Sequence, residues 1–362
     1  MAAACFDRHI NNFLNTIPAD GETFDAQSKC MDMTMDSSTD FLLGCSTNNL
    51  VKPSPESRPI TADFEFSARE SAYRARLGSL LYFLPHGERD RSVKRLREYV
   101  RSYMNRAAEE KAKAAGGPED AKERGYVFLD ELLKQNPSEE YTIDTILSIL
   151  LAGRDTTAAA LTALFYFLAR SPEVVEKLRE EIAEAGAESP SFDTLKNMKY
   201  LNNIVKEGVV PIPANMFGAA LRLFPPISTN SRMTNKETIL PRGGGPDGKL
   251  PILVPKGTSV RFSSCALQRS QEVYGPDADE FRPERWESSL RAGWSYIPFS
   301  GGPRICIGQQ FALTQVLYTL YKFFGEFQSI EARDPMPLGV RSSLSSSFAN
   351  GCLISVKRAR GK

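Results

Sequence analysis

Residues 298–312 read PFSGGPRICIGQQFA, and this stretch decides the fold class of the chain. Gly302 and Gly308 lie on either side of Cys306 and allow the backbone to approach a bulky flat group closely. The residues that follow predict a helix over 309–324, whose first N–H groups and positive dipole end favour a thiolate at Cys306. An isolated cysteine is usually a packing residue, but this combination is typical of a metal ligand.

Composition limits the other possibilities. The chain has 362 residues and a formal net charge of +1, so we expect a globular protein with no nucleic-acid partner. Its 2 histidines, His9 and His86, exclude a histidine-rich metal site, and its 6 cysteines contain no CxxC pair. The longest uncharged apolar stretch, 156–169, is too short to cross a bilayer, and we expect no membrane anchor in this chain.

Hydrophobic periodicity predicts a mainly α chain with a small β portion. We expect a charged amphipathic helix over 89–113 and a buried helix that Ser138 opens and that runs to Ala169. Short strands are expected within 225–260, and an irregular segment over 283–304. The glycine-rich stretch 243–249 is interpreted as a turn, because Leu250 stands where a phosphate-binding loop needs Ser or Thr.

A second motif, AGRDTT at 152–157, lies inside the buried helix. A carboxylate at Asp155 beside the hydroxyl of Thr156 would relay protons into an otherwise apolar site. Gly153 would leave space for a small ligand such as dioxygen. The alternative, a helix N-cap, is disfavoured because the apolar pattern continues on both sides.

The pattern FxxGxRxCxG over 299–308 resembles the signature of the cytochrome P450 family, and AGRDTT resembles its oxygen-activating motif. The resemblance implies a single domain over 1–362 with the P450 fold, lacking its N-terminal part. It also implies haem b as the cofactor, with Cys306 as the axial iron ligand and Asp155 and Thr156 as the catalytic acid–alcohol pair. The other residues implied to form the cofactor site are Phe299, Gly302, Arg304, Gly308, Arg232 and Gly153.

The family also has a buried ion-pair core, in which a Glu and an Arg three positions apart bind a second Arg. The segment FRPERW at 281–286 supplies Arg285, and LRLFPPI at 221–227 supplies Arg222. The matching Glu207 lies 15 positions before Arg222 (222 minus 207), because 12 extra residues intervene within 208–220. Prolines in that insertion forbid a continuous helix. Either the insertion loops out and Glu207 still reaches Arg222, or the helix is broken and the site is damaged.

Four further stretches, at 240–249, 254–257, 274–286 and 308–314, resemble the fungal branch that hydroxylates n-alkanes and long-chain fatty acids at or near the chain end. This resemblance implies O2, an apolar substrate bound near Ala152 and 227–230, and electrons from NADPH-cytochrome P450 reductase. Arg291, Arg304 and Lys322 would help to dock that reductase. Full-length members lie at the cytosolic face of the endoplasmic reticulum membrane.

Three alternatives remain open for the function. The first is hydroxylation of a polyketide-type secondary metabolite. The second is an inactive truncated fragment. The third is haem-thiolate chemistry without external oxygen, such as an isomerisation, against which Asp155 and Thr156 argue.

Overall fold

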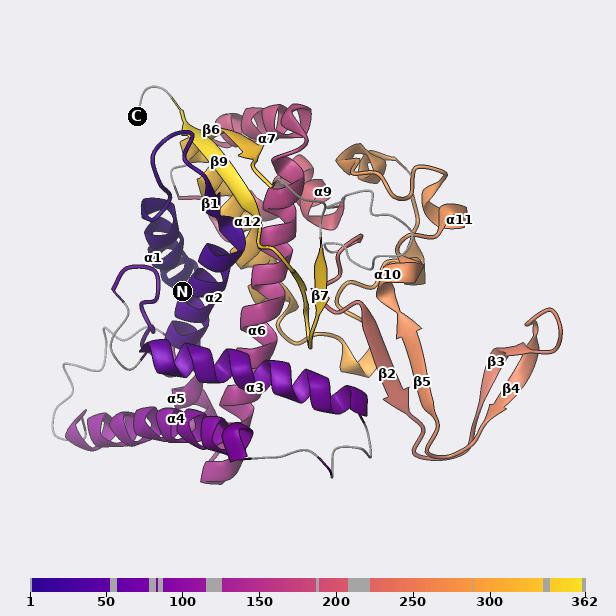
Figure 1. Ribbon diagram of the computed structural model, residues 1–362, viewed down its shortest axis with the longest axis horizontal. Coiled ribbons are helices and arrows are strands. Elements are labelled where there is room, and N and C mark those ends of the chain that lie inside the picture. The colour runs from indigo at the N-terminus through magenta and orange to yellow at the C-terminus, as the bar shows by residue number, and fades with distance from the viewer. Residues whose placement is uncertain are drawn as a thin grey trace.

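The computed structural model describes residues 2–52, 57–77, 83, 87–114, 126–186, 189–207, 222–288, 290–334 and 339–359 (Figure 1). The insertion at 208–220 and His86 lie outside the described residues. The expected mainly α class is confirmed. The helices are α1 (Ala2–Asn15), α2 (Ala26–Leu43), α3 (Ser57–Leu77), α4 (Gly87–Ala114), α5 (Phe128–Leu133), α6 (Glu139–Leu168), α7 (Pro172–Ala185), α8 (Phe192–Asn197), α9 (Lys199–Glu207), α10 (Ser264–Leu267), α11 (Gln271–Tyr274) and α12 (Gln309–Glu326).

Helix α6 runs through the middle of the helical body (Figure 1). Ser138 caps it by accepting a hydrogen bond from the Tyr141 N–H at 3.3 Å, and every residue from Thr157 to Leu168 is buried. Helices α2 and α12 pack against it, and apolar side chains of all three meet in the main core. Among the described helices, only α6 is long and apolar enough to cross a membrane, and more than half of that apolar window is buried in the protein.

A three-stranded antiparallel sheet in the order β1-β9-β6 joins the two ends of the chain. Its strands are β1 (Phe24–Asp25), β6 (Phe327–Ala332) and β9 (Leu353–Arg358). The sequence did not predict it, because a two-residue strand carries no periodic pattern and its partner lies more than 300 positions away. A further antiparallel pair is formed by β7 (Val340–Ser342) and β8 (Ser346–Phe348).

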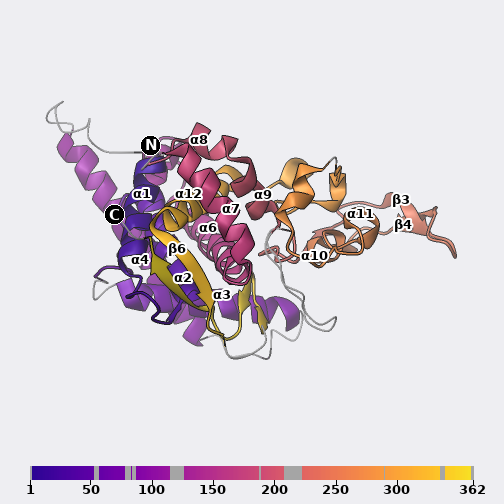
Figure 2. The same ribbon diagram turned by 90° about the horizontal axis from the view of Figure 1, so that it is seen from above.

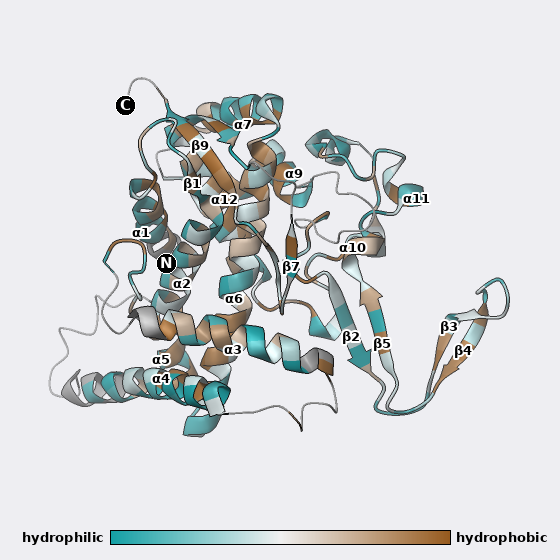
Figure 3. Cartoon of the chain, in the orientation of Figure 1, coloured by the Kyte–Doolittle hydropathy of each residue, from teal (hydrophilic) through white to brown (hydrophobic). Residues whose placement is uncertain are grey.

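The strands expected within 225–260 are present. They are β2 (Thr229–Met233), β3 (Thr238–Gly244), β4 (Leu250–Val254) and β5 (Ser259–Ser263). The pairs β2–β5 and β3–β4 are antiparallel, and the β3–β4 hairpin extends away from the helical body (Figures 1 and 2). Its strands carry exposed apolar residues, which Figure 3 shows in brown. Residues 243–249 form the hairpin turn, with the Gly243 N–H bonded to the Gly248 carbonyl at 2.8 Å, so this stretch is not a phosphate loop.

Helix α9 is held where its last residue, Glu207, points into the interior. The carboxylate of Glu181 on α7 accepts hydrogen bonds from the N–H groups of Tyr200 and Leu201, both at 2.8 Å, and so caps the start of α9. After residue 282 the chain is irregular, as expected, with short 3-10 helices at Pro283–Glu287, Gly293–Ser295 and Gly302–Arg304. This irregular segment leads directly into α12.

Candidate functional site

Cys306 lies in the cysteine loop at the start of α12 and is exposed. The Cys306 N–H donates to the Phe299 carbonyl at 3.0 Å, which closes the loop. Gly308 is the N-cap residue of α12, and among the described residues no side chain caps this end. The unpaired N–H groups of the first turn therefore give the segment around Cys306 the anion-favouring end of a helix.

The other cysteines are less accessible. Cys30, Cys265 and Cys352 are buried and Cys45 is half-buried, whereas the side chain of Cys5 lies outside the described residues. Burial raises the pKa of the Cys30 and Cys352 thiols. Among the described cysteines, only Cys306 is both exposed and next to a helix N-terminus.

Large apolar side chains around Cys306 are also exposed, which is unusual for a loop beside a core helix. Ile307 is 99% exposed, Ile305 52% and Trp294 73%. A surface of this kind suits an apolar ligand that covers it. Phe299, one of the residues implied to form the cofactor site, is half-buried and packs on the main core.

The three glycines of the loop differ in why the structure favours a glycine at each position. Gly302 has a φ of +70°, a conformation that favours glycine. Gly301, which the sequence analysis did not single out, lies against Trp294, whose ring would be 2.5 Å from an added Cβ. At Gly308 an added Cβ would be 3.9 Å from the Cys306 sulfur, so no described protein atom requires a glycine there. Its predicted role in accommodating a flat ligand stays a prediction.

In the α6 motif, Asp155 and Thr156 form hydrogen bonds with different partners. The Thr156 hydroxyl donates to the Ala152 carbonyl at 2.6 Å, one turn earlier, and Asp155 accepts from Arg154 at 3.1 Å. Burial raises the pKa of Asp155, which the positive charge of Arg154 opposes. Helix α6 continues through the motif, so the N-cap interpretation is excluded.

Gly153 faces helix α2. The Cβ that it lacks would lie 3.7 Å from the hydroxyl oxygen of Ser38, at ordinary contact distance. Gly153 therefore lies where α2 and α6 contact each other. Its predicted role in leaving space for dioxygen stays a prediction.

The buried ion-pair core is assembled across the insertion. Arg222 donates to both carboxylate oxygens of Glu207, at 2.9 and 2.8 Å, and both side chains are fully buried. Of the two alternatives for the insertion, the structure has the one in which Glu207 reaches Arg222. Arg285 also donates to Glu207, at 3.0 Å, and is itself 4% exposed.

The remaining groups of this core are also hydrogen-bonded. Trp286 donates its indole N–H to Glu207 at 2.8 Å, and Arg285 binds the Asp277 carboxylate at 3.1 and 3.2 Å. The Arg285 hydrogen bonds hold the pKa of Asp277 below its usual range. Two arginines and two carboxylates balance in charge, and this makes their burial energetically acceptable. The sequence analysis identified neither Asp277 nor the contact of Trp286, because neither follows from the Glu–Arg spacing.

The resemblance implies Arg304 and Arg232 at the cofactor, and Arg291, Arg304 and Lys322 where a reductase docks. Arg304 and Arg291 are exposed, as is Arg232 on β2, whose guanidinium donates to the Asn230 side chain at 2.9 Å. The expectation for Lys322 is wrong, because its side chain is only 15% exposed and pairs with Asp7 at 3.4 Å. It therefore does not add to a docking surface.

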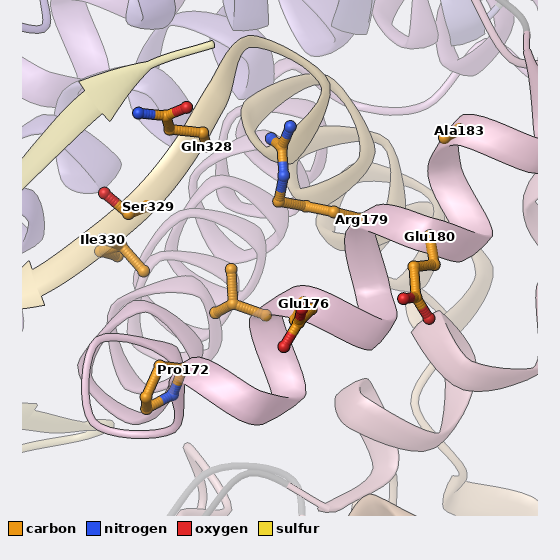
Figure 4. A pocket seen from close by; sticks show the side chains of 9 residues that line it. Pro172, Glu176, Arg179, Glu180, Ala183, Gln328, Ser329 and Ile330 are labelled. Atoms are coloured by element: carbon orange, nitrogen blue, oxygen red, sulfur yellow. The ribbon is translucent and has the colours of Figure 1, made fainter.

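A cavity of about 500 Å³ lies between α7 and β6 and is lined by Arg179, Gln328 and Ile330 among others (Figure 4). None of the predicted site residues lines it. We therefore do not relate this cavity to the cysteine loop.

The residues present fit the haem that the resemblance implies. Over the described chain, no group of three or more His, Cys, Asp and Glu side chains gathers as a bare metal ion would need. One exposed sulfur suits an iron that brings its other ligands with it, as in haem. Ile305 and Ile307 offer apolar surface, and the exposed Arg304 and Arg232 are suited to bind propionates. When bound, the haem would supply the redox chemistry of dioxygen, while Cys306 would hold its iron.

Comparison with known proteins agrees with this geometry. The family model for Cytochrome P450 matches residues 3–343. The chain is similar to Cytochrome P450 monooxygenase FPY7 of Fusarium mangiferae, with 37% identity over 364 residues, 99% of this chain and 67% of the relative. It is also similar to Cytochrome P450 monooxygenase himC of Aspergillus japonicus, with 38% identity over 98% of this chain and 62% of the relative.

A second group of relatives has a different name. Cytochrome P450 52A13 of Debaryomyces hansenii is 40% identical over 336 residues, 88% of this chain and 62% of the relative. The chain thus spans a little under two thirds of the length of most of these curated relatives. Its cysteine loop, its α6 motif and these matches together place it in one family: the chain belongs to the cytochrome P450 family.

Proposed function

We propose that the chain is the haem-binding and oxygen-activating part of a monooxygenase that hydroxylates a long-chain, lipid-like substrate. The observation that carries this proposal is the exposed Cys306 at the uncapped start of α12, surrounded by exposed apolar side chains. Members of the family bind haem through a cysteine thiolate. The reaction would convert RH, O2, NADPH and a proton to ROH, water and NADP⁺.

In this proposal the residues of the chain divide the work. Cys306 holds the iron, and Arg304 and Arg232 hold the propionates. Asp155 and Thr156 on α6 bring protons to the face where dioxygen is reduced. The buried core of Glu207, Arg222 and Arg285 stabilises the segment that precedes the cysteine loop.

The substrate class is argued from sequence likeness. Stretches 240–249, 254–257, 274–286 and 308–314 resemble fungal hydroxylases of n-alkanes and fatty acids, so we propose oxidation at the terminal or a near-terminal carbon. The relatives named as monooxygenases and the relative named Cytochrome P450 52A13 have similar identities to this chain, from 37% to 40%. These identities therefore do not decide between an alkane or fatty acid and a polyketide-type metabolite as the substrate. The proposed electron donor is NADPH-cytochrome P450 reductase, at the cytosolic face of the endoplasmic reticulum.

The proposal is tested by expressing the chain with a haem supply, reducing it and adding carbon monoxide. We expect haem uptake and a band at about 450 nm, as for cysteine-ligated haem. The loaded chain is then incubated with reductase, NADPH and either an n-alkane, a fatty acid or a polyketide, and the products are identified by mass spectrometry. A chain that takes up no haem would support the alternative of an inactive fragment.

A further inference from the structure

Arg154 is a buried cation in the middle of α6 that two helices share. Its Nη2 donates to the carboxylate of Glu65 on α3 at 2.5 Å, and its Nη1 donates to Asp155 at 3.1 Å. The Arg154 side chain is 2% exposed, whereas Glu65 is 53% exposed and Asp155 17%. The three residues, here called the Arg154 clamp, thus lead from solvent to the oxygen-activating motif.

The clamp differs from the ion-pair core in how its arginine is bonded. Arg222 donates to Glu207 and to three backbone carbonyls, so its guanidinium is fixed. The Nε of Arg154 is buried and has no hydrogen-bond partner among the described residues. A buried donor without a partner costs free energy, so the guanidinium of Arg154 is held less firmly than that of Arg222. Arg154 is therefore suited to more than one arrangement.

Other charges surround the clamp. Helix α2 contributes Lys29, Asp32 and Asp36, of which Asp36 is fixed by the hydroxyl of Thr47 and the Asn49 N–H, each at 2.7 Å. Burial raises the pKa of Asp32 to about 6, with Asp36 acting in the same direction. Burial also raises the pKa of Asp155; Arg154 opposes this, and the negative charge of Glu65 adds to it. Carboxylates on three helices thus compete for Arg154, whereas Lys29 acts on Asp32 alone.

We propose that Arg154 is a positioning residue shared by Asp155 and Glu65, in which the ion pair with Glu65 weakens the bond to Asp155. Helix α3 would thereby set how firmly the Asp155 carboxyl group is held beside Thr156. The purpose of this arrangement rests on the proposed function, in which Asp155 supplies protons. Asp155 gives up a proton as a carboxylic acid and becomes a carboxylate. It is protonated again from bulk solvent on the exposed Glu65 side, so each cycle passes one solvent proton inward and leaves Asp155 unchanged.

The test measures the titration of Asp155 directly, without turnover. The infrared carboxyl band of the intact chain is followed with pH, and the spectrum of Asp155→Asn is subtracted to remove Asp32 and other carboxyls. In Glu65→Gln, Arg154 loses its ion pair with Glu65 and the negative charge that raises the pKa of Asp155 is removed, so the midpoint of Asp155 falls by about one pH unit. In Arg154→Met it rises, and in Arg154→Lys, which keeps the charge, it stays closer to that of the parent.

Glu70→Gln is the matched control. Glu70 lies on the same helix and forms an ion pair with Arg74 at 3.3 Å, but it is not part of the clamp, so its replacement leaves the midpoint of Asp155 unchanged. Because Glu65 is 53% exposed, its replacement tests the clamp even where Arg154→Met does not fold. An unchanged or raised midpoint in Glu65→Gln overturns the inference.

In the haem-loaded chain with reductase and substrate, Glu65→Gln also changes the ratio of hydrogen peroxide to hydroxylated product, and it shifts the pH profile of that ratio toward lower pH. The two readouts separate the claims. A shifted midpoint in a chain that makes no product keeps the clamp and rejects the proposed function. Product formation with an unshifted midpoint of Asp155 keeps the proposed function and rejects the clamp.

Discussion

Glu207 shows how much a single residue can contribute to this fold. Its carboxylate accepts hydrogen bonds from Arg222, Arg285 and Trp286, and it lies in the interior with no exposed surface. The sequence identifies the three charged residues by their context. It cannot decide whether Glu207 and Arg222 meet, because chain separation across a proline-containing insertion does not fix a distance in space.

We predict that Glu207→Gln lowers the free energy of unfolding by about 3–5 kcal/mol, because two buried guanidiniums then lose their shared counter-charge. Equilibrium denaturation in urea measures the change. Glu272→Gln, at an exposed position, is the control and changes the value by less than about 0.5 kcal/mol. A small loss in Glu207→Gln would mean that the core depends on other contacts.

At the level of elements, the long helices follow from the sequence and the short strands do not. Helix α6 was expected to run from Ser138 to Ala169 and spans Glu139–Leu168, because an N-cap serine and a long apolar run specify it locally. The β1-β9-β6 sheet depends on pairing between distant segments, which no local pattern contains. The Arg154 clamp was missed for the same reason, since Glu65 lies 89 positions from Arg154.

Helix α9 provides a test of the insertion. Removing residues 209–220 places Arg222 three positions after Glu207, where a continued helix brings both side chains to the same face. We expect the Glu207–Arg222 pair and haem uptake to be retained, and stability to be equal or higher, because a shorter closed loop costs less entropy. Thermal unfolding and haem content measure this. Loss of both would show that the insertion has a structural role.

The carboxyl group of Asp32 on helix α2 is expected to make the stability of the chain depend on pH. Because burial raises the pKa of Asp32 to about 6, the folded chain binds a proton more tightly than the unfolded chain, and stability due to this group is lost as pH rises from about 4 to 6. Asp32→Asn removes this loss and stabilises the chain above pH 6 by on the order of 1–2 kcal/mol, allowing for partial exposure. Glu22→Gln, at an exposed site, should show no such pH-dependent gain.

In the whole molecule, the two ends of the chain are joined at one sheet. Asp25 in β1 accepts hydrogen bonds from the N–H groups of Gln27 and Cys352, at 2.9 and 2.8 Å. Gly351 has a φ of +76°, and a Cβ there would lie 2.8 Å from the Asp25 carboxylate. The N-terminal helices and the C-terminal strands are thus closely packed around a glycine.

We predict that Gly351→Ala lowers the free energy of unfolding by about 2–3 kcal/mol, from backbone strain together with the clash against Asp25. Gly257→Ala is the matched control, because Gly257 also has a positive φ, +84°, but no atom lies within 4 Å of an added Cβ. Its loss should be about 1 kcal/mol. Equal losses in both variants would contradict the proposed contact between the two ends.

The central claim is that Cys306 holds the haem iron, and the carbon monoxide spectrum of Cys306→Ser tests it most directly. Cys45→Ser, at a half-buried cysteine away from the loop, is the control. We expect the band at about 450 nm in the parent and in Cys45→Ser, and its loss in Cys306→Ser, because serine supplies no thiolate. An unchanged band in Cys306→Ser would contradict the account.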